Sequence, residues 1–134
     1  MKANELMIGD YVNYRGQIIK VTSLYDKGGS NEVGWSDKEC IWVNADNVEP
    51  IPLTNEILEK NGFEKSWQGN YEFFDDDENL NIDFFPKSTN YTNGAYDYID
   101  IERGCLTIDE MPIAFVHELQ HVLILCESKK EIVL

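Results

Sequence analysis

A β-hairpin near the beginning of the chain is predicted by the sequence Ile8-Gly9-Asp10-Tyr11-Val12-Asn13-Tyr14-Arg15-Gly16-Gln17-Ile18-Ile19-Lys20-Val21. Apolar and polar side chains alternate on both sides of Arg15-Gly16, which is the pattern of strands that bury one face. A polar residue followed by glycine between two such segments forms a tight turn. The first part of the chain is therefore predicted to be β structure.

Further strands are expected after this hairpin, at residues 33–35 and 40–43, beyond a Gly-Gly-Ser-Asn loop at residues 28–31. A glycine turn before the first strand and a second glycine in the hairpin resemble the opening of SH3-like barrels. We therefore expect a small SH3-like β-barrel over residues 1–52. Such barrels bind peptides, nucleic acids or neighbouring domains, and the fold alone does not choose among these ligands.

The second part of the chain alternates helix and strand signals. Pro50-Ile51-Pro52 is expected to be an extended connector, and Thr54 to cap a short helix that ends at Asn61-Gly62. Strand-like segments follow at residues 70–74, 80–85, 96–102 and 105–108, and a closing helix is expected to begin near Pro112. The predicted fold is α+β: the barrel, then a lobe at 53–134 with a helix, about four antiparallel strands and a C-terminal helix. We expect the two lobes to pack together, since one sheet face otherwise lacks cover.

The charge of the chain is strongly acidic. Its 134 residues include 25 Asp or Glu and 11 Lys or Arg, which gives a formal net charge of −14. Residues 1–52 hold eight acids and five bases, whereas residues 53–134 hold seventeen acids and six bases. Direct binding of nucleic acid requires a basic surface and is not expected. A partner protein with a basic surface fits this charge, and a small ligand is the other expected partner.

The sequence favours a cytoplasmic protein. It contains no opening apolar segment of a signal peptide and no run of 18 apolar residues, so membrane spanning is not expected. Its three cysteines, Cys40, Cys105 and Cys126, are odd in number and far apart. This pattern is typical of reduced thiols in a reducing compartment.

A metal-binding motif, His117-Glu118-Leu119-Gln120-His121, matches the H-E-x-x-H signature of zinc peptidases. In those enzymes the two histidines bind zinc, and the glutamate activates the metal-bound water. A catalytic zinc needs a third protein ligand. The chain has no third histidine, which leaves Cys126, Glu131 or an upstream carboxylate. A zinc-dependent hydrolase, with His117 and His121 as ligands and Glu118 as base, is the alternative hypothesis for function, and zinc is the one cofactor it would need.

The same segment also has the pattern of an ordinary amphipathic helix. An apolar stripe is formed by Phe115, Val116, Leu119, Val122, Leu123 and Cys126. On this interpretation the stripe packs on the core, and His117, Glu118 and His121 lie on a solvated face. The match to the zinc motif is then a coincidence, and this is the interpretation we favour.

Two further sets of residues are candidates for a binding surface. The first is aromatic and comprises Tyr14, Trp35 and Trp42, for which packing within the small barrel is the competing interpretation. The second is the acidic turn formed by Asp75, Asp76, Asp77 and Glu78. Its spacing resembles the start of an EF-hand loop, but Leu80 and Pro86 stand where that loop needs glycine and glutamate. A solvated hairpin tip is therefore expected.

Several segments together resemble a family of small uncharacterised proteins carried by bacteriophages and mobile elements of gut anaerobes. They are residues 2–12, Val48-Glu49-Pro50-Ile51-Pro52-Leu53-Thr54, Leu58-x-x-x-Gly62-Phe63 and Val116-His117-Glu118-Leu119-Gln120. His121 departs from the asparagine that often follows the last segment in that family, which weakens the zinc hypothesis. The resemblance implies a context and no activity. We predict a non-catalytic accessory protein that binds a host protein or a small ligand. Antagonism of host defence through mimicry of DNA charge is a specific form of this hypothesis.

Overall fold

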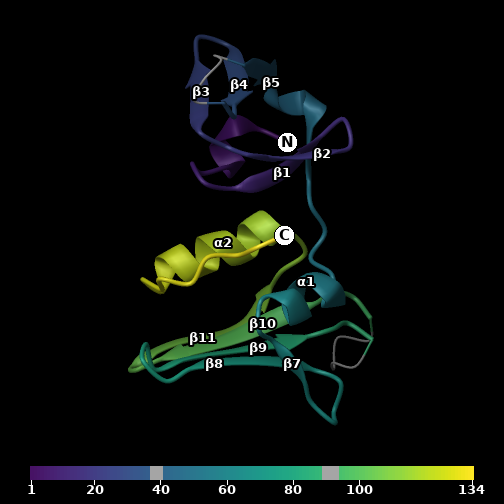
Figure 1. Cartoon of the computed structure of the whole chain (residues 1–134), viewed down its shortest axis with the longest axis vertical. Coiled ribbons are helices and arrows are strands. Elements are labelled where there is room, and N and C mark those ends of the chain that lie inside the picture. Colours follow the sequence, from purple (N-terminus) through teal and green to yellow (C-terminus); the bar gives the residue numbers. More distant parts are fainter. Residues whose placement is uncertain (37–40, 89–93) are drawn as a thin grey trace. The chain divides into compact units, whose positions relative to one another are not determined.

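The structure is a computed structural model that describes residues 1–36, 41–88 and 94–134 (Figure 1). The chain divides into two compact units. Unit 1 comprises Met1–Pro52 and Phe115–His117, and unit 2 comprises Leu53–Ala114 and Glu118–Leu134. The described residues form eleven strands in three antiparallel sheets, together with two α-helices. The protein is therefore a mostly β chain with a smaller helical part.

The described residues of unit 1 form two three-stranded sheets and two short 3-10 helices. The first sheet has the order β2-β1-β6 and is built from β1 (Tyr11–Tyr14), β2 (Gln17–Lys20) and β6 (Val48–Pro50). The second has the order β3-β4-β5 and is built from β3 (Ser23–Lys27), β4 (Ser30–Gly34) and β5 (Trp42–Asn44). The 3-10 helices are η1 (Ala3–Glu5) and η2 (Ala45–Asn47). The predicted strand at 40–43 begins at Cys40, which lies outside the described residues.

The hairpin predicted around Arg15-Gly16 is confirmed, because β1 and β2 pair from Tyr11 opposite Lys20 to Tyr14 opposite Gln17. Arg15 and Gly16 have φ angles of 51° and 83°, the left-handed conformations of a type I′ turn. The Asn13 side chain accepts a hydrogen bond from the Gly16 N–H at 2.8 Å. The turn and the alternating pattern therefore act together to set this register.

A closed barrel is not found among the described residues of unit 1. The physical reason lies at Val21-Thr22, where the chain leaves one sheet and enters the other. The Val21 N–H donates to the Asp10 carbonyl beside the first sheet, and the Thr22 N–H donates to the Gly34 carbonyl of the second. The core of the unit is formed by Ala3, Leu6, Val12, Ile19, Val21, Val33, Ala45 and Val48.

Unit 2 is built on a five-stranded antiparallel sheet with the order β11-β10-β9-β8-β7. Its strands are β7 (Glu64–Lys65), β8 (Tyr71–Asp75), β9 (Leu80–Phe85), β10 (Tyr98–Arg103) and β11 (Leu106–Pro112). Its helices are α1 (Asn55–Lys60) and α2 (Val116–Leu125), the latter from Glu118 onward. In Figure 1 both helices lie on the same side of this sheet. The other face of the sheet carries neither helix.

The short helix of unit 2 follows its sequence signals. The Thr54 hydroxyl accepts the Ile57 N–H at 3.3 Å, and the chain leaves α1 through Asn61 and Gly62, whose φ is 89°. The Asn61 side chain then exchanges two hydrogen bonds with the main chain of Val133, at 2.8 and 2.7 Å. The end of α1 therefore also holds the C-terminal segment.

Two predicted boundaries in unit 2 were wrong. The closing helix begins at Val116 and not near Pro112, because Pro112 still belongs to β11 and lies opposite Tyr98. β11 consequently extends beyond the predicted residues 105–108. The edge strand β7 has two residues and was not predicted, because so short a segment shows no alternation.

Candidate functional site

The H-E-x-x-H segment lies at the beginning of α2. His117 is 7% exposed and its ring stacks on Phe115, with the ring centres 5.9 Å apart. The expectation that His117 lies on a solvated face was therefore wrong, and Phe115, which is only partly buried, precedes the helix. The remaining stripe residues, Val116, Leu119, Val122, Leu123 and Cys126, are buried as predicted.

The arrangement of this segment does not assemble a complete metal site. The Glu118 carboxylate accepts the Ala114 N–H at 3.1 Å, a bond typical of a helix N-terminus. Within residues 1–36, 41–88 and 94–134, no group of three His, Cys, Asp or Glu side chains is arranged to hold a metal ion. The third ligand that catalytic zinc needs is not supplied by this part of the chain.

The candidate aromatic residues of unit 1 are only partly brought together. The rings of Tyr14 and Trp35 lie 5.2 Å apart and pack against the core of the unit. The guanidinium of Arg15 lies 5.2 Å from the Tyr14 ring centre. Trp42 on β5 is 42% exposed. Tyr14 and Trp35 therefore serve packing, and Trp42 contributes exposed aromatic surface.

The acidic turn between β8 and β9 has a structural role at one of its four candidate residues. The Glu78 carboxylate accepts the Ser128 hydroxyl and the Lys129 N–H, both at 2.6 Å. These two bonds, with the larger effect from Ser128, lower the pKa of Glu78. Asp75 accepts the Glu78 N–H within the turn at 3.2 Å, while Asp76 and Asp77 are exposed. The turn therefore fastens the segment that follows α2.

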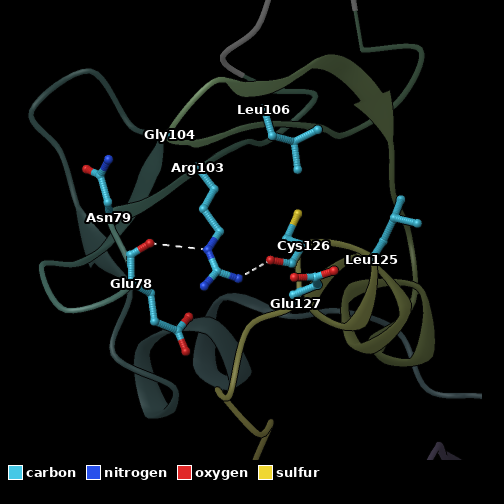
Figure 2. Close-up of a pocket in the computed structure, with 8 residues that line it drawn as sticks. All are labelled: Glu78, Asn79, Arg103, Gly104, Leu106, Leu125, Cys126 and Glu127. Atoms are coloured by element: carbon cyan, nitrogen blue, oxygen red, sulfur yellow. Dashed lines mark hydrogen bonds between the residues drawn. The ribbon is translucent and has the colours of Figure 1, made fainter.

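A pocket of about 450 Å³ lies beside this turn (Figure 2). It is lined by Glu78, Asn79, Arg103, Gly104, Leu106, Leu125, Cys126 and Glu127. Arg103 occupies its centre, where Nε donates to the Glu78 carbonyl at 3.2 Å and Nη1 donates to the Cys126 carbonyl. A cation that binds the last carbonyls of a helix satisfies acceptors which otherwise lack partners. Arg103 therefore joins the hairpin tip to the end of α2.

Cys126 is the one thiol in this pocket. Burial raises the pKa of its thiol, and the nearby charge of Arg103 opposes that effect only in part. A thiol with a raised pKa is mostly protonated at neutral pH and is a poor nucleophile. Cys105 is exposed, and both thiols are free, whereas Cys40 lies outside the described residues. The residues of this pocket therefore connect the hairpin tip to the end of α2, and its thiol is a poor nucleophile.

The most distinctive electrostatic feature of unit 2 is a line of four acids on adjacent strands. Glu64 lies opposite Glu72, Glu72 opposite Asp83, and Asp83 opposite Asp100. Paired residues of antiparallel strands project from the same face, and the strands lie about 4.8 Å apart. We call Glu64, Glu72, Asp83 and Asp100 the acidic row. Their strand neighbours Ile82, Phe84, Ile99 and Ile101 are buried on the opposite face.

Asp83, one of the two inner members of the acidic row, has a raised pKa. Burial, and then the charges of Glu72, Asp100 and Glu102, raise the pKa of Asp83 from 3.8 to about 6. Asp100 is held in place by the Glu110 N–H, which donates to its carboxylate at 2.7 Å from the irregular part of β11. The acidic row was not predicted from the sequence, because cross-strand register is set by pairing across the sheet.

Comparison with known proteins gives no family assignment: no family model, no curated protein and no solved structure matches the chain. No helix in the described part of the chain is both long and apolar enough to cross a membrane.

Proposed function

We propose that this protein is a non-catalytic acidic accessory protein of phage or mobile-element origin that acts in the cytoplasm by binding a host protein with a basic surface. The observation that carries the proposal is the acidic row across β7, β8, β9 and β10. Like charges directly opposite each other in a sheet destabilise it. Such an arrangement suits a surface whose repulsion is relieved when a cationic partner binds.

The overall charge distribution supports the same proposal. Seventeen of the 25 acids belong to residues 53–134, the part of the sequence that contains the acidic row. A one-sided field of this kind accelerates encounter with oppositely charged proteins and disfavours wrong partners. It also makes binding sensitive to salt, because exposed charges are screened beyond about 10 Å at moderate ionic strength.

The test is capture of partners from host lysate with three forms of the protein. The wild type is compared with a variant that neutralises the acidic row, namely Glu64→Gln, Glu72→Gln, Asp83→Asn and Asp100→Asn. A matched control neutralises four exposed acids elsewhere, namely Asp26→Asn, Asp46→Asn, Glu49→Gln and Asp76→Asn. Both variants change the net charge equally, so they separate a local surface from total charge.

We expect a basic host protein to be captured by the wild type and the control, to be lost with the acidic-row variant, and to be released by high salt. Equal capture by both variants would show that the row is not the binding surface. In the specific form of the proposal, mimicry of DNA charge, the captured protein binds DNA. Duplex DNA should then displace it, and a partner that DNA leaves in place contradicts mimicry.

For unit 1 we propose an SH3-like arrangement of the two sheets. Its support is that β2 and β3 are separated only by Val21-Thr22, and that the short helix η2 lies between β5 and β6. An experimental structure in which one bent segment from Gln17 to Lys27 serves both sheets would support this proposal. Sheets that share no segment would contradict it.

A further inference from the structure

Trp67 is the most exposed large apolar side chain among the residues that the structure describes. It is 93% exposed, whereas Trp42 in unit 1 is 42% exposed. Burial of an aromatic side chain stabilises a fold, and Trp67 at this exposure gains almost none of that stabilisation within its own unit. Tryptophan is enriched among the few residues that dominate protein interfaces. Packing within its own unit therefore does not account for this tryptophan.

The turn that carries Trp67 is held by four hydrogen bonds. The Ser66 N–H donates to the Asn70 carbonyl at 2.7 Å, and the Gly69 N–H donates to the Ser66 carbonyl at 3.1 Å. The Gln68 N–H donates to the Ser66 hydroxyl at 3.2 Å, and that hydroxyl bonds the Asn70 side chain. A turn fixed before binding loses little conformational entropy when it is bound.

This turn is connected to the acidic row. It joins β7 to β8, the strands that carry Glu64 and Glu72. The Asn70 side-chain amide donates to the Glu72 carboxylate at 3.4 Å. The turn that carries Trp67 therefore begins two residues after Glu64, the end member of the row.

The sheet face that bears the row also bears aromatic side chains. Alternation along the strands puts Phe74 on the face of Glu72, Phe85 on that of Asp83, and Tyr98 on that of Asp100. Phe74 is 61% exposed, whereas Tyr98 is only 6% exposed and its ring stacks on that of Phe85 with centres 4.8 Å apart, so Phe74 supplies the accessible ring. Carboxylates and aromatic rings on one face match both chemical features of an arginine side chain.

We propose that the partner of the acidic row presents arginine side chains to it and that Trp67 stacks on one of their guanidinium groups; this inference rests on the proposed function. Guanidinium is planar, weakly hydrated and able to pair with a carboxylate through two parallel hydrogen bonds. It also lies flat on an indole ring, which is the strongest aromatic acceptor of a cation. The ammonium of lysine is a strongly hydrated point charge and gains less from the ring.

The experiment titrates the full-length protein with octa-arginine and octa-lysine peptides at low ionic strength by calorimetry. We expect the wild type to bind octa-arginine more tightly. Trp67→Ala should weaken octa-arginine binding by about two- to fivefold, the range for an exposed cation–π contact, and weaken octa-lysine binding less. Trp67→Phe should retain part of the preference. Trp42→Ala is the matched control, since it removes another exposed tryptophan and should change neither affinity.

The outcomes separate the inference from the proposed function. Equal effects of Trp67→Ala on the two peptides, or none on either, would overturn the role of Trp67 while the acidic row stands. Octa-arginine binding that survives neutralisation of the acidic row would instead overturn the row itself. Unchanged thermal unfolding of Trp67→Ala, expected for so exposed a side chain, ensures that lost affinity reports a lost contact.

Discussion

Asp83 on β9 stands directly opposite Asp100 on β10, so two carboxylates share one position of the antiparallel ladder. Glu72 flanks Asp83 from the other side on β8. A carboxylate that is half-buried between two others gives up its proton less readily, because desolvation and like charge both oppose its ionised form. The surface we propose for binding is therefore also a site of electrostatic strain in the free protein.

Asp83 should make the free protein less stable as pH rises through about 6. Its pKa is raised in the folded state, so its favourable contribution is complete below the ordinary pKa near 4 and is lost as the folded group ionises. Asp83→Asn replaces the ionisable carboxyl with a neutral amide, so the variant does not lose this stability as pH rises. After allowance for solvent screening we expect a gain of about 1 kcal/mol, or about 3 °C in unfolding temperature, at pH 7.5 and none below about pH 4.

Thermal unfolding across this pH range, with Asp76→Asn as an exposed control, checks the prediction. Asp76 lies at the tip of the acidic turn and outside the row. A wild-type curve that shows no fall in stability relative to Asp83→Asn between pH 4 and 7 would contradict the assignment of strain to Asp83.

Arg103 is expected to contribute to stability through the two carbonyls it binds. Arg103→Met removes the hydrogen bonds to Glu78 and Cys126 and leaves the end of α2 without its cation. Hydrogen bonds from charged donors each contribute roughly 1.5–3 kcal/mol, so the loss of two such bonds is expected to cost about 3–6 kcal/mol. Arg103→Lys should recover part of it. Urea unfolding measures the change, and an unaltered midpoint in Arg103→Met would show that the junction is unimportant.

Local signals in the sequence were sufficient for the hairpins and the first helix. Arg15-Gly16 admits the left-handed turn between β1 and β2, and Thr54 supplies the hydroxyl that begins α1. Both depend on residues within a few positions of one another. Such features can be predicted because their physical cause is contained in the segment itself.

The features that define the candidate site have causes far apart in the chain. Asp83 and Asp100 are seventeen positions apart and become neighbours only through strand pairing. Glu78 bonds Ser128, fifty residues later, although the sequence indicates a solvated tip. His117 is buried and its ring stacks on that of Phe115, a contact that helical periodicity does not reveal. Each of these contacts depends on tertiary packing, which cannot be read from the patterns of a single sequence.

Zinc binding by His117 and His121 is expected to be substoichiometric. His117 is buried, and a third ligand is not assembled with the pair in the described part of the chain. Elemental mass spectrometry of tag-free protein, alongside His121→Asn, measures the metal directly. One zinc per chain that is lost in the variant would contradict this expectation. In that case Glu118→Gln should abolish hydrolase activity and retain the metal.

The C-terminal segment is expected to detach from the acidic turn at low pH. The hydrogen bonds from Ser128 and Lys129 lower the pKa of Glu78, so its contribution is present above the ordinary pKa near 4.5 and is lost as pH falls through the lower, folded value. Hydrogen exchange of residues 128–133 should therefore accelerate in acid beyond its intrinsic pH dependence. Glu78→Gln should give faster exchange already at neutral pH and remove the excess acid effect. Asp77→Asn alters a neighbouring exposed acid that makes no such bond, so equal changes in both variants would contradict the role of Glu78.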